Sequence, residues 1–507
     1  MKSSWNWWSA LCGVISVGLG LLLSELVAGF LSPSVSALTA VGGVVIDALP
    51  PGVKDWAISL FGTSDKTVFL LAMCVIVVLL AGLAGVLELR KKNWGQVGVG
   101  IFGVLGVLAV LSRAQAAPVA LLSPLVAAVV GILLLRISVA KLRGWQAAPA
   151  AANGRRAFLR TVTRSGLGLL LAALATAALR GSQAAYQGAR DKLLLPVPAN
   201  PAPAIPASAR LPVPGISDLV TGNQQFYRID TALSVPVVNP DDWQLKVTGL
   251  VDREVTLNLS ELLSQPMVER YVTIACVSNE VGGDLIGNAR WLGWPVRELL
   301  ARAGVKSGAD MVLSRSTDGF TASTPLEAMT DQRDALIAVA MNGEFLPLEH
   351  GFPARLIVPG LYGYVSATKW LTELKVTTFA ADVAYWSTRG WSDHGPIKQS
   401  SRIDTPRQGA SVSAGKVVFA GMAWAQGKGI SKVEVKLDGG GWQPAQLATG
   451  ISKDSWLQWR AELQLASGQH QVQVRSTDGS GVLQSADSAP PAPDGSSGYH
   501  QISVTAS

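Results

Sequence analysis

Long apolar segments are concentrated in the first 180 residues of the chain, whereas the later residues alternate short apolar and polar stretches. An α-helix that crosses a bilayer needs about 20 apolar residues. Five segments reach or approach this length, and they cover residues 7–31, 68–89, 97–111, 117–135 and 165–179. The pattern predicts about five transmembrane helices in a membrane domain of residues 1–181.

Basic residues between these segments predict their orientation. Lys and Arg occur before the first segment, after the second, and between the fourth and the fifth. Cytoplasmic loops accumulate such residues, so these three sites are expected on the inner face of the membrane. Five alternating spans then place everything after about residue 181 outside the cytoplasm, with Arg113 alone in a short outer loop. We therefore expect a multi-pass protein of the cytoplasmic membrane with an extracytoplasmic C-terminal part.

The fifth segment is preceded by the basic stretch GRRAFLR, residues 154–160. This stretch resembles a twin-arginine export signal, which would suit a domain that acquires a cofactor before export. Paired arginines ahead of a span are also common as a positive-inside anchor. Both interpretations of Arg155 and Arg156 remain open from the sequence.

The rest of the chain divides into three parts by composition. Residues 182–215 are dense in Pro and Ala, which favours an extended spacer that holds a domain off the bilayer. Over residues 216–400, short strand-like runs mix with helix-like runs such as Leu259–Leu263 and Val296–Ala303, which predicts an α+β domain. Over residues 401–507, short strand-like runs recur between Gly, Asp and Ser turns, which predicts an immunoglobulin-like β-sandwich.

The charge and the positions of the cysteines and histidines argue against several kinds of partner and metal site. The net charge of +7 does not indicate a nucleic-acid partner, because many basic residues lie beside apolar segments. Of the three cysteines only Cys276 lies in the soluble part, which excludes a disulfide framework and a multi-cysteine zinc site there. All four histidines lie at or beyond His350, so no bis-histidine haem is expected within the membrane domain.

Cys276 follows the apolar run YVTIA and precedes the polar, Gly-rich stretch VSNEVGG. A thiol at the end of a strand can meet a ligand, and a soft thiolate suits a transition metal. From the residues alone, a small buried core residue is the more common role of such a cysteine. A cysteine hydrolase is a further alternative, and it needs a general base such as His350 beside the thiol.

Further motifs follow Cys276 in a fixed order. They are GNARWLGWP at residues 287–295, HGFPARLIVPG at residues 350–360 and YGYVSATKWL at residues 362–371. Together with the cysteine and its polar turn, they resemble the sulfite oxidase family of molybdopterin-dependent oxidoreductases. The resemblance covers about residues 220–507. It implies an α+β sulfite-oxidase-type molybdopterin domain and the family's immunoglobulin-like C-terminal β-sandwich, and both follow the N-terminal transmembrane helices predicted from the apolar segments.

The resemblance implies a molybdenum–molybdopterin cofactor. Cys276 matches the thiolate ligand of molybdenum and is expected to be catalytic, together with Tyr385, which lies about where the family has an active-site tyrosine. The positions that match cofactor-binding residues are Tyr227, Arg228, Cys276, Asp318, His350, Arg355, Ser366 and Lys369. The cations among them suit a buried phosphate. A packed aromatic at Tyr385 and a turn-forming Asp318 are the alternatives.

The residues after the cysteine depart from the family pattern. Sulfite oxidases usually continue with an Ala-Gly-Asn-Arg-Arg type of sequence, whereas this chain has VSNE at residues 277–280. Because a basic pocket attracts an oxyanion, the absence of the paired arginines weakens the expectation that sulfite is the substrate. Reduction of a sulfoxide, as in the related methionine sulfoxide reductase catalytic subunit, is the other reaction that the resemblance implies.

The leading functional hypothesis is two-electron oxo transfer on a small-molecule substrate by a membrane-anchored, extracytoplasmic domain. The expected partners are the membrane and a separate electron-transfer protein or quinone-linked protein, with no nucleic acid. The C-terminal domain mediates dimers in sulfite oxidases, so a homodimer is one expected assembly. The alternative hypothesis is a non-enzymatic, membrane-anchored surface protein with a degenerate cofactor fold.

Overall fold

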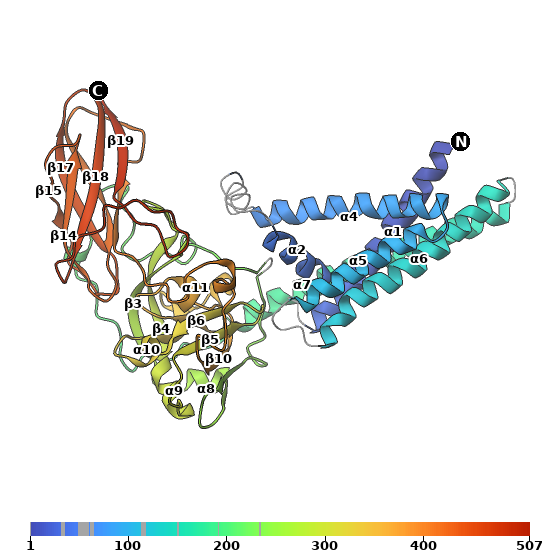
Figure 1. Ribbon diagram of the computed structural model, residues 1–507, viewed down its shortest axis with the longest axis horizontal. Coiled ribbons are helices and arrows are strands. Elements are labelled where there is room, and N and C mark those ends of the chain that lie inside the picture. The colour runs from blue at the N-terminus through green and yellow to red at the C-terminus, as the bar shows by residue number, and fades with distance from the viewer. Residues whose placement is uncertain are drawn as a thin grey trace. The chain divides into compact units, whose positions relative to one another are not determined.

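The computed structural model describes residues 2–31, 36–48, 60, 65–112, 118–149, 152–190, 192–232 and 235–507. The chain forms two compact units, whose helices and strands are labelled in Figure 1. The first unit comprises residues 1–188 with residues 232–236, and the second comprises residues 189–231 with residues 237–507.

The first unit is helical. Its described elements are α1 (Lys2–Leu31), α2 (Ala37–Asp47), α4 (Asp65–Arg90), α5 (Trp94–Leu111), η3 (Pro118–Leu121), α6 (Leu122–Ala147) and α7 (Ala152–Arg190). Among the described residues, five of these helices are long and apolar enough to cross a membrane, which confirms the five predicted apolar segments. Arg113 and the predicted start of the fourth span at residue 117 lie outside the described residues.

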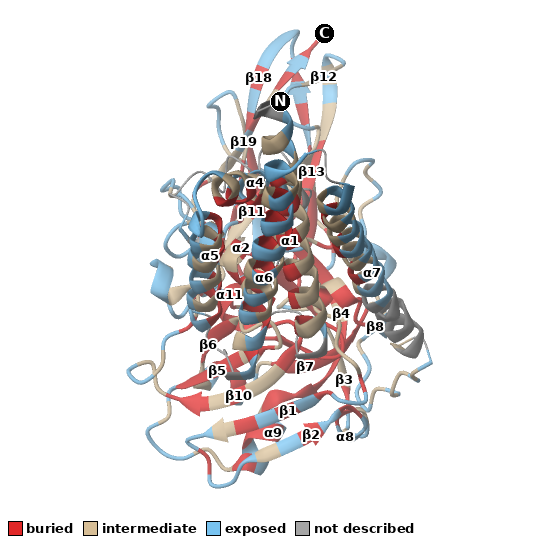
Figure 2. Ribbon diagram, turned by 90° about the vertical axis from the view of Figure 1, so that its right-hand side faces the viewer, coloured by how far each residue is buried: buried red, intermediate tan, exposed pale blue. Residues whose placement is uncertain are grey.

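Small residues allow close helix packing in this unit. A Cβ atom added at Gly13 of α1 would lie 1.9 Å from the carbonyl oxygen of Ala81 in α4, and one at Gly85 would lie 2.0 Å from that of Ser9. Only glycine therefore fits at these two positions, as is common where membrane helices cross. Much of the outer surface of α5 and α6 is exposed in Figure 2, and it carries Leu, Ile and Val side chains that suit contact with lipid.

Two sheets form the α+β domain of the second unit. One has the order β2-β1-β10-β5-β6, with β1 and β10 parallel and the other neighbours antiparallel. The other has the antiparallel order β3-β4-β7-β8, and β9 also pairs with β7. The strands are β1 (Gln244–Gly249), β2 (Val255–Asn258), β3 (Val268–Ala275), β4 (Ile286–Pro295), β5 (Met311–Ser316), β6 (Thr321–Pro325), β7 (Leu336–Met341), β8 (Glu344–Phe345), β9 (Arg355–Ile357) and β10 (Leu371–Thr377).

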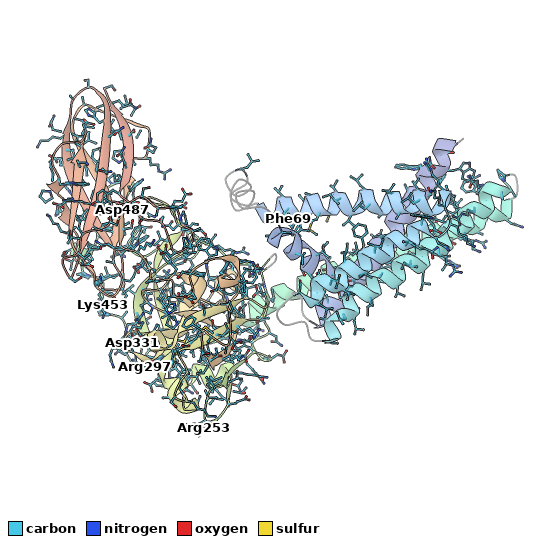
Figure 3. The ribbon with its side chains drawn as sticks, in the orientation of Figure 1. Phe69, Arg253, Arg297, Asp331, Lys453 and Asp487 are labelled. Atoms are coloured by element: carbon cyan, nitrogen blue, oxygen red, sulfur yellow. The ribbon has the colours of Figure 1, made fainter. Side chains whose placement is uncertain are left out.

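Short helices connect these strands. They are η4 (Ala207–Ala209), α8 (Leu259–Leu263), α9 (Val296–Ala303), α10 (Leu326–Thr330), η5 (Leu348–His350), α11 (Gly363–Ser366) and η6 (Ser387–Arg389). Helix α8 starts at a capping box in which Asn258 and Glu261 satisfy each other's backbone N–H groups. Helix α9 buries Leu299 and Leu300, while Arg297, labelled in Figure 3, donates to the carboxylate of Asp334 at 3.3 Å.

The C-terminal domain is a β-sandwich. Its two sheets have the orders β11-β13-β17-β16 and β12-β19-β18-β14-β15. The strands are β11 (Ser400–Thr405), β12 (Ala410–Val412), β13 (Gly415–Trp424), β14 (Ile430–Leu437), β15 (Gln443–Pro444), β16 (Gln446–Leu447), β17 (Leu457–Leu465), β18 (Gly468–Asp478) and β19 (His500–Ala506). Phe419 and Trp459 of one sheet pack with Val435 and Val472 of the other in a shared core. The predicted immunoglobulin-like sandwich is therefore confirmed.

The Pro- and Ala-rich segment differs from the predicted spacer. Helix α7 continues to Arg190, and the chain beyond it lies along the second unit instead of standing free. The N–H of Ala199 donates to the carbonyl oxygen of Met267 at 2.7 Å, and that of Leu211 donates to the side chain of Gln458 at 2.7 Å. Ala209 is fully buried in the core of the unit. Proline favours extended backbone, as the sequence indicated, but extended backbone also pairs and packs when its neighbours offer acceptors.

Replacing Ala209 with leucine is expected to destabilise the second unit by about 2 kcal/mol, because a larger side chain overpacks a filled core. The exposed neighbour Ala207 provides the control, since leucine there meets solvent. Denaturant titration of both variants, followed by tryptophan fluorescence, measures the difference. Equal stability of the two variants would mean that the segment is the free spacer that its composition predicts.

Candidate functional site

Cys276 directly follows strand β3, in a turn held by backbone hydrogen bonds. Its N–H donates to the carbonyl oxygen of Leu285 at 2.9 Å, and its own carbonyl accepts from the N–H of Asn279 at 3.1 Å. The buried side chain of Asn279 accepts from the N–H of Leu285 at 2.8 Å. The turn thus holds the buried Cys276 thiol at the end of a rigid sheet, where a functional group is well positioned.

Two residues of the C-terminal domain also donate hydrogen bonds to the same turn. Arg402 of β11 donates to the carbonyl oxygen of Gly283 at 2.7 Å, and the hydroxyl of Ser496 donates to that of Asn279 at 2.7 Å. Arg402 is itself paired with Asp404 at 2.7 Å. These contacts join residues that are far apart in the sequence, and no local pattern indicates them. The sandwich therefore helps to fix the conformation of the cysteine turn.

Arg355 lies at the centre of a buried basic cluster that also contains His350 and Lys369. Its guanidinium donates to the carbonyl oxygens of His350 and Ala367 at 3.1 and 3.2 Å. Its Nε is buried and has no hydrogen-bond partner among the described residues. Leaving a buried donor unpaired costs free energy, so this Nε is suited to an acceptor on a bound group.

Lys369 and Arg228 converge on one carboxylate. The ammonium of Lys369 donates to Asp230 at 2.7 Å and to the carbonyl oxygen of Glu349 at 3.0 Å. Arg228 pairs with the same Asp230 oxygen at 3.0 Å. Asp230 is a site residue that the sequence analysis missed, although its position two residues after Arg228 could have indicated it.

Tyr227 lies close to both the thiol and the basic cluster. Burial, reinforced by the nearby Cys276, raises the pKa of the Tyr227 phenol well above its ordinary range, and Arg355 opposes this shift. The Tyr227 ring stacks on Phe226, whose ring meets His350 edge to face with the centroids 5.7 Å apart. Tyr227 thus lies in the same neighbourhood as the Cys276 thiol and Arg355, and it is connected to His350 through Phe226.

Burial also lowers the pKa values of the basic side chains in this cluster. It lowers the pKa of Arg355 to about 10 and that of Lys369 to about 8, while Asp230 raises the latter in part. It lowers the pKa of His350 to about 4, so this imidazole is neutral at neutral pH. Its Nε2 lies 2.8 Å from the carbonyl oxygen of Asn223, which fits a protonated Nε2 donor. Desolvated cations favour an anion that enters the site.

The other predicted residues are placed differently. The hydroxyl of Ser366 is buried and donates to the carbonyl oxygens of Leu361 and Tyr362, both at 2.9 Å. Asp318 accepts from the N–H of Phe320 in the β5–β6 turn at 3.3 Å, which fits the turn-forming alternative. Tyr385 packs under the guanidinium of Arg389, which lies 3.6 Å from the ring centroid. The cofactor and catalytic roles assigned to these residues remain predictions.

The donor set fits an anionic cofactor that brings its own metal ligands. Among the described residues, no group of three or more His, Cys, Asp or Glu side chains is arranged to hold a metal ion. A metal at Cys276 would therefore take most of its ligands from a bound group. The unpaired Nε of Arg355 and the buried ammonium of Lys369 suit the phosphate of a pterin, which is strongly anionic.

Comparison with known proteins agrees with this chemistry. The family described as "Oxidoreductase molybdopterin binding domain" matches residues 232–386, and "Bacterial Ig domain" matches residues 400–474. Mitochondrial sulfite oxidase of Homo sapiens is 30% identical over 304 residues, which cover 50% of this chain and 55% of that protein. Residues 232–386 therefore form a molybdopterin-binding domain, and it is similar to that of the sulfite oxidases.

Proteins with other names are also similar to parts of this chain. Nitrate reductase [NADH] 2 of Nicotiana tabacum is 33% identical over 178 residues, which cover 30% of this chain and 20% of that protein. The sulfane dehydrogenase SoxCD from Paracoccus pantotrophus aligns with 24% identity and a TM-score of 0.47 over 53% of this chain and 77% of that chain. The chain spans about half the length of the human sulfite oxidase and about a fifth of the length of the nitrate reductases. The cofactor of the molybdopterin domain is molybdenum–molybdopterin.

The cofactor-free protein is expected to lose up to about 3 kcal/mol of stability as the pH falls from about 6.5 to about 4. The unfolded chain protonates His350 near its ordinary pKa, whereas burial lowers the folded pKa to about 4. Within this window the unfolded state binds more protons, so acid favours unfolding. Urea titrations at several pH values should show a weaker dependence for His350→Gln. The exposed His394→Gln is the control, and an unchanged slope in the His350 variant would contradict a neutral, buried imidazole.

Proposed function

We propose that this protein is a membrane-anchored oxidoreductase whose molybdopterin domain acts on a small molecule outside the cytoplasm. The observation that carries the proposal is the buried basic cluster of His350, Arg355 and Lys369, linked through Tyr227 to the Cys276 thiol. A surface protein without a cofactor gains nothing from three desolvated groups of this kind, because each is costly to bury. The non-enzymatic alternative is therefore disfavoured.

Each residue of the site has a proposed task. When bound, the molybdenum–molybdopterin group supplies two-electron redox chemistry coupled to the transfer of an oxo group. Cys276 provides a thiolate to the metal from its fixed turn. Arg355 and Lys369 bind the phosphate end of the pterin, and the neutral His350, whose Nε2 donates to Asn223, accepts a hydrogen bond at the pterin through Nδ1. The phenol of Tyr227 stays protonated at neutral pH, so it is a hydrogen-bond donor near the thiol.

A neutral substrate fits the surroundings of Cys276 better than an oxyanion does. Glu280 is exposed in the cysteine turn, at a position where the resemblance implies a basic residue. Asp494, on the connection that also carries Ser496, is paired with Lys398 at 2.8 Å, so its charge is balanced there. An exposed carboxylate such as that of Glu280 repels a sulfite dianion and tolerates a sulfoxide. We therefore favour sulfoxide reduction over sulfite oxidation.

The proposed cellular arrangement follows from the helical unit. Five apolar helices anchor the protein in the cytoplasmic membrane, and the charge pattern favours an extracytoplasmic molybdopterin domain. Electrons would pass to or from a separate electron-transfer protein or a quinone-linked protein. A homodimer through the C-terminal sandwich is a further proposal.

Turnover of two substrates tests the proposed reaction. The full chain, made in cells that synthesise the cofactor and purified in detergent, is assayed with methyl phenyl sulfoxide plus a reduced viologen and with sulfite plus an artificial electron acceptor. We expect sulfoxide turnover to exceed sulfite turnover by at least about tenfold, because an unfavourable local charge disfavours the anion. Faster sulfite oxidation would reverse the assigned substrate class. No turnover of either substrate by cofactor-loaded protein would contradict oxo transfer.

A further inference from the structure

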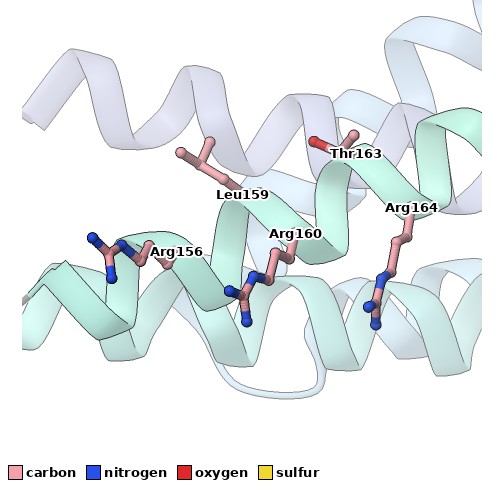
Figure 4. Close-up of a pocket in the computed structure, with 5 residues that line it drawn as sticks. All are labelled: Arg156, Leu159, Arg160, Thr163 and Arg164. Atoms are coloured by element: carbon pink, nitrogen blue, oxygen red, sulfur yellow. The ribbon is translucent and has the colours of Figure 1, made fainter.

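One face of helix α7 carries a row of exposed arginines at its N-terminal end. Arg156, Arg160 and Arg164 are four residues apart, so they lie on successive turns of the same face. In Figure 4, Arg160 and Arg164 extend in the same direction from the helix. A pocket is lined by these three arginines together with Leu159 and Thr163. The guanidinium groups therefore border a concave surface.

The same face becomes apolar towards the C-terminal end of the helix. Leu167, Leu171 and Leu174 continue the row, and their exposed fractions are 55%, 57% and 58%. Arg156 and Leu174 are 18 residues apart, which is about five full turns of an α-helix. The arginines and the leucines thus form one straight stripe along α7, basic at one end and apolar at the other.

The opposite face of α7 is already occupied by protein. Phe158 is fully buried and meets Trp8 of α1 and Trp145 of α6 at centroid distances of 5.6 and 5.5 Å. Gly168 and Leu19 also approach closely along this side of the helix. The exposed stripe therefore points away from the packing partners of α7 within its unit.

Among the residues that the structure describes, no carboxylate balances the charge of these arginines. The chain has no Asp or Glu between Glu88 and Asp191. Across the described ranges, no carboxylate lies within ion-pair distance of Arg156, Arg160 or Arg164. An anion from outside the protein is the natural partner for three adjacent guanidinium groups, which match the geometry of a phosphate.

We propose that this stripe of α7 binds an anionic phospholipid. The phosphodiester lies against the guanidinium groups of Arg156, Arg160 and Arg164, and an acyl chain follows Leu167, Leu171 and Leu174. Helix α7 is long and apolar enough to cross a membrane, and in that placement the stripe would run from the headgroup region into the hydrocarbon of one leaflet. The site is independent of the proposed enzymatic function, and it gives the helix that leads to the molybdopterin domain a defined lipid contact.

Lipid binding to the full chain in detergent tests the proposal. Native mass spectrometry compares phosphatidylglycerol with phosphatidylcholine on the natural protein and on Arg160→Gln/Arg164→Gln. We expect phosphatidylglycerol to bind at least about tenfold more tightly than phosphatidylcholine, and the double variant to bind it about 30-fold more weakly than the natural protein. The matched control is Arg136→Gln/Lys141→Gln, which removes two exposed basic residues from α6 and should retain binding.

Three results would overturn the proposal. Equal affinity for both lipids would exclude recognition of the anionic headgroup. Equal losses in the α7 and α6 double variants would indicate a general effect of net charge. Equally tight binding of the water-soluble glycerophosphoglycerol would show a phosphate site without the acyl contact. Unfolding midpoints of the variants, measured in the same detergent, show whether each remains folded.

Discussion

Replacing Cys276 with serine is expected to lower oxidoreductase activity more than about 100-fold, which exceeds the usual effect of changing an outer-shell residue of a metal site. The hydroxyl of serine is a poor substitute for a soft thiolate at a transition metal. The backbone hydrogen bonds of the turn do not involve the sulfur atom, so the fold around Asn279 and Leu285 should persist. Pterin content should stay close to that of the natural protein, because Arg355 and Lys369 are unchanged.

The matched control for this variant is Cys74→Ser, since Cys74 is an exposed cysteine of α4 in the helical unit. It should retain full activity. Steady-state turnover and pterin released by denaturation are measured on the same preparations. Substantial activity in Cys276→Ser would remove the thiolate from the proposed reaction, and activity lost with the pterin would assign Cys276 to cofactor retention instead.

Replacing Lys369 with methionine is expected to destabilise the cofactor-free protein by about 3 kcal/mol, because breaking a buried ion pair leaves a charge behind. The ammonium and the Asp230 carboxylate are 2.7 Å apart, and their side chains are 9% and 3% exposed. Arg228 still pairs with Asp230 in this variant. The expected loss of stability is therefore near the lower end of the range for broken buried ion pairs. Urea titration measures the change in stability.

A second variant separates stability from cofactor binding. Asp230→Asn/Lys369→Met removes both charges, so it should recover most of the lost stability. It should still bind little pterin, because the proposed phosphate contact of Lys369 is absent. Full pterin content in this double variant would show that Lys369 serves the fold through Asp230 and does not hold the cofactor.

Local sequence patterns predicted the elements whose residues carry a clear periodicity or capping. Helix α8 and helix α9 have the predicted bounds, and the strands β11 to β19 lie in residues 401–507 or start one residue before them, where strand-like runs were expected. Strand β7 was not predicted, because its sequence LIAVAM is buried on both faces and has no alternation that separates a strand from a helix. The Pro- and Ala-rich segment was misinterpreted because its partners, such as Met267, are distant in the sequence.

The site could be predicted only as far as its residues lie in recognisable motifs. Cys276, His350, Arg355 and Lys369 come from three such motifs and are all buried, and the half-buried Tyr227 lies near Cys276 and Arg355. Asp230 was not predicted, because an acidic residue is not expected to bind an anionic cofactor. In the structure it pairs with the cations Arg228 and Lys369. The hydrogen bonds that Arg402 and Ser496 donate to the cysteine turn depend on how two domains pack, and no local sequence pattern reveals this packing.

The coordination of molybdenum in the purified full chain tests the proposed site most directly. X-ray absorption at the molybdenum edge, combined with metal and pterin analysis, is applied to the natural protein and to Cys276→Ser. We expect stoichiometric molybdenum and pterin in the natural protein, and the loss of one sulfur neighbour of molybdenum in the variant. A folded protein without molybdenum and pterin, or the same sulfur coordination in both proteins, would contradict Cys276 as the thiolate ligand of a molybdopterin centre.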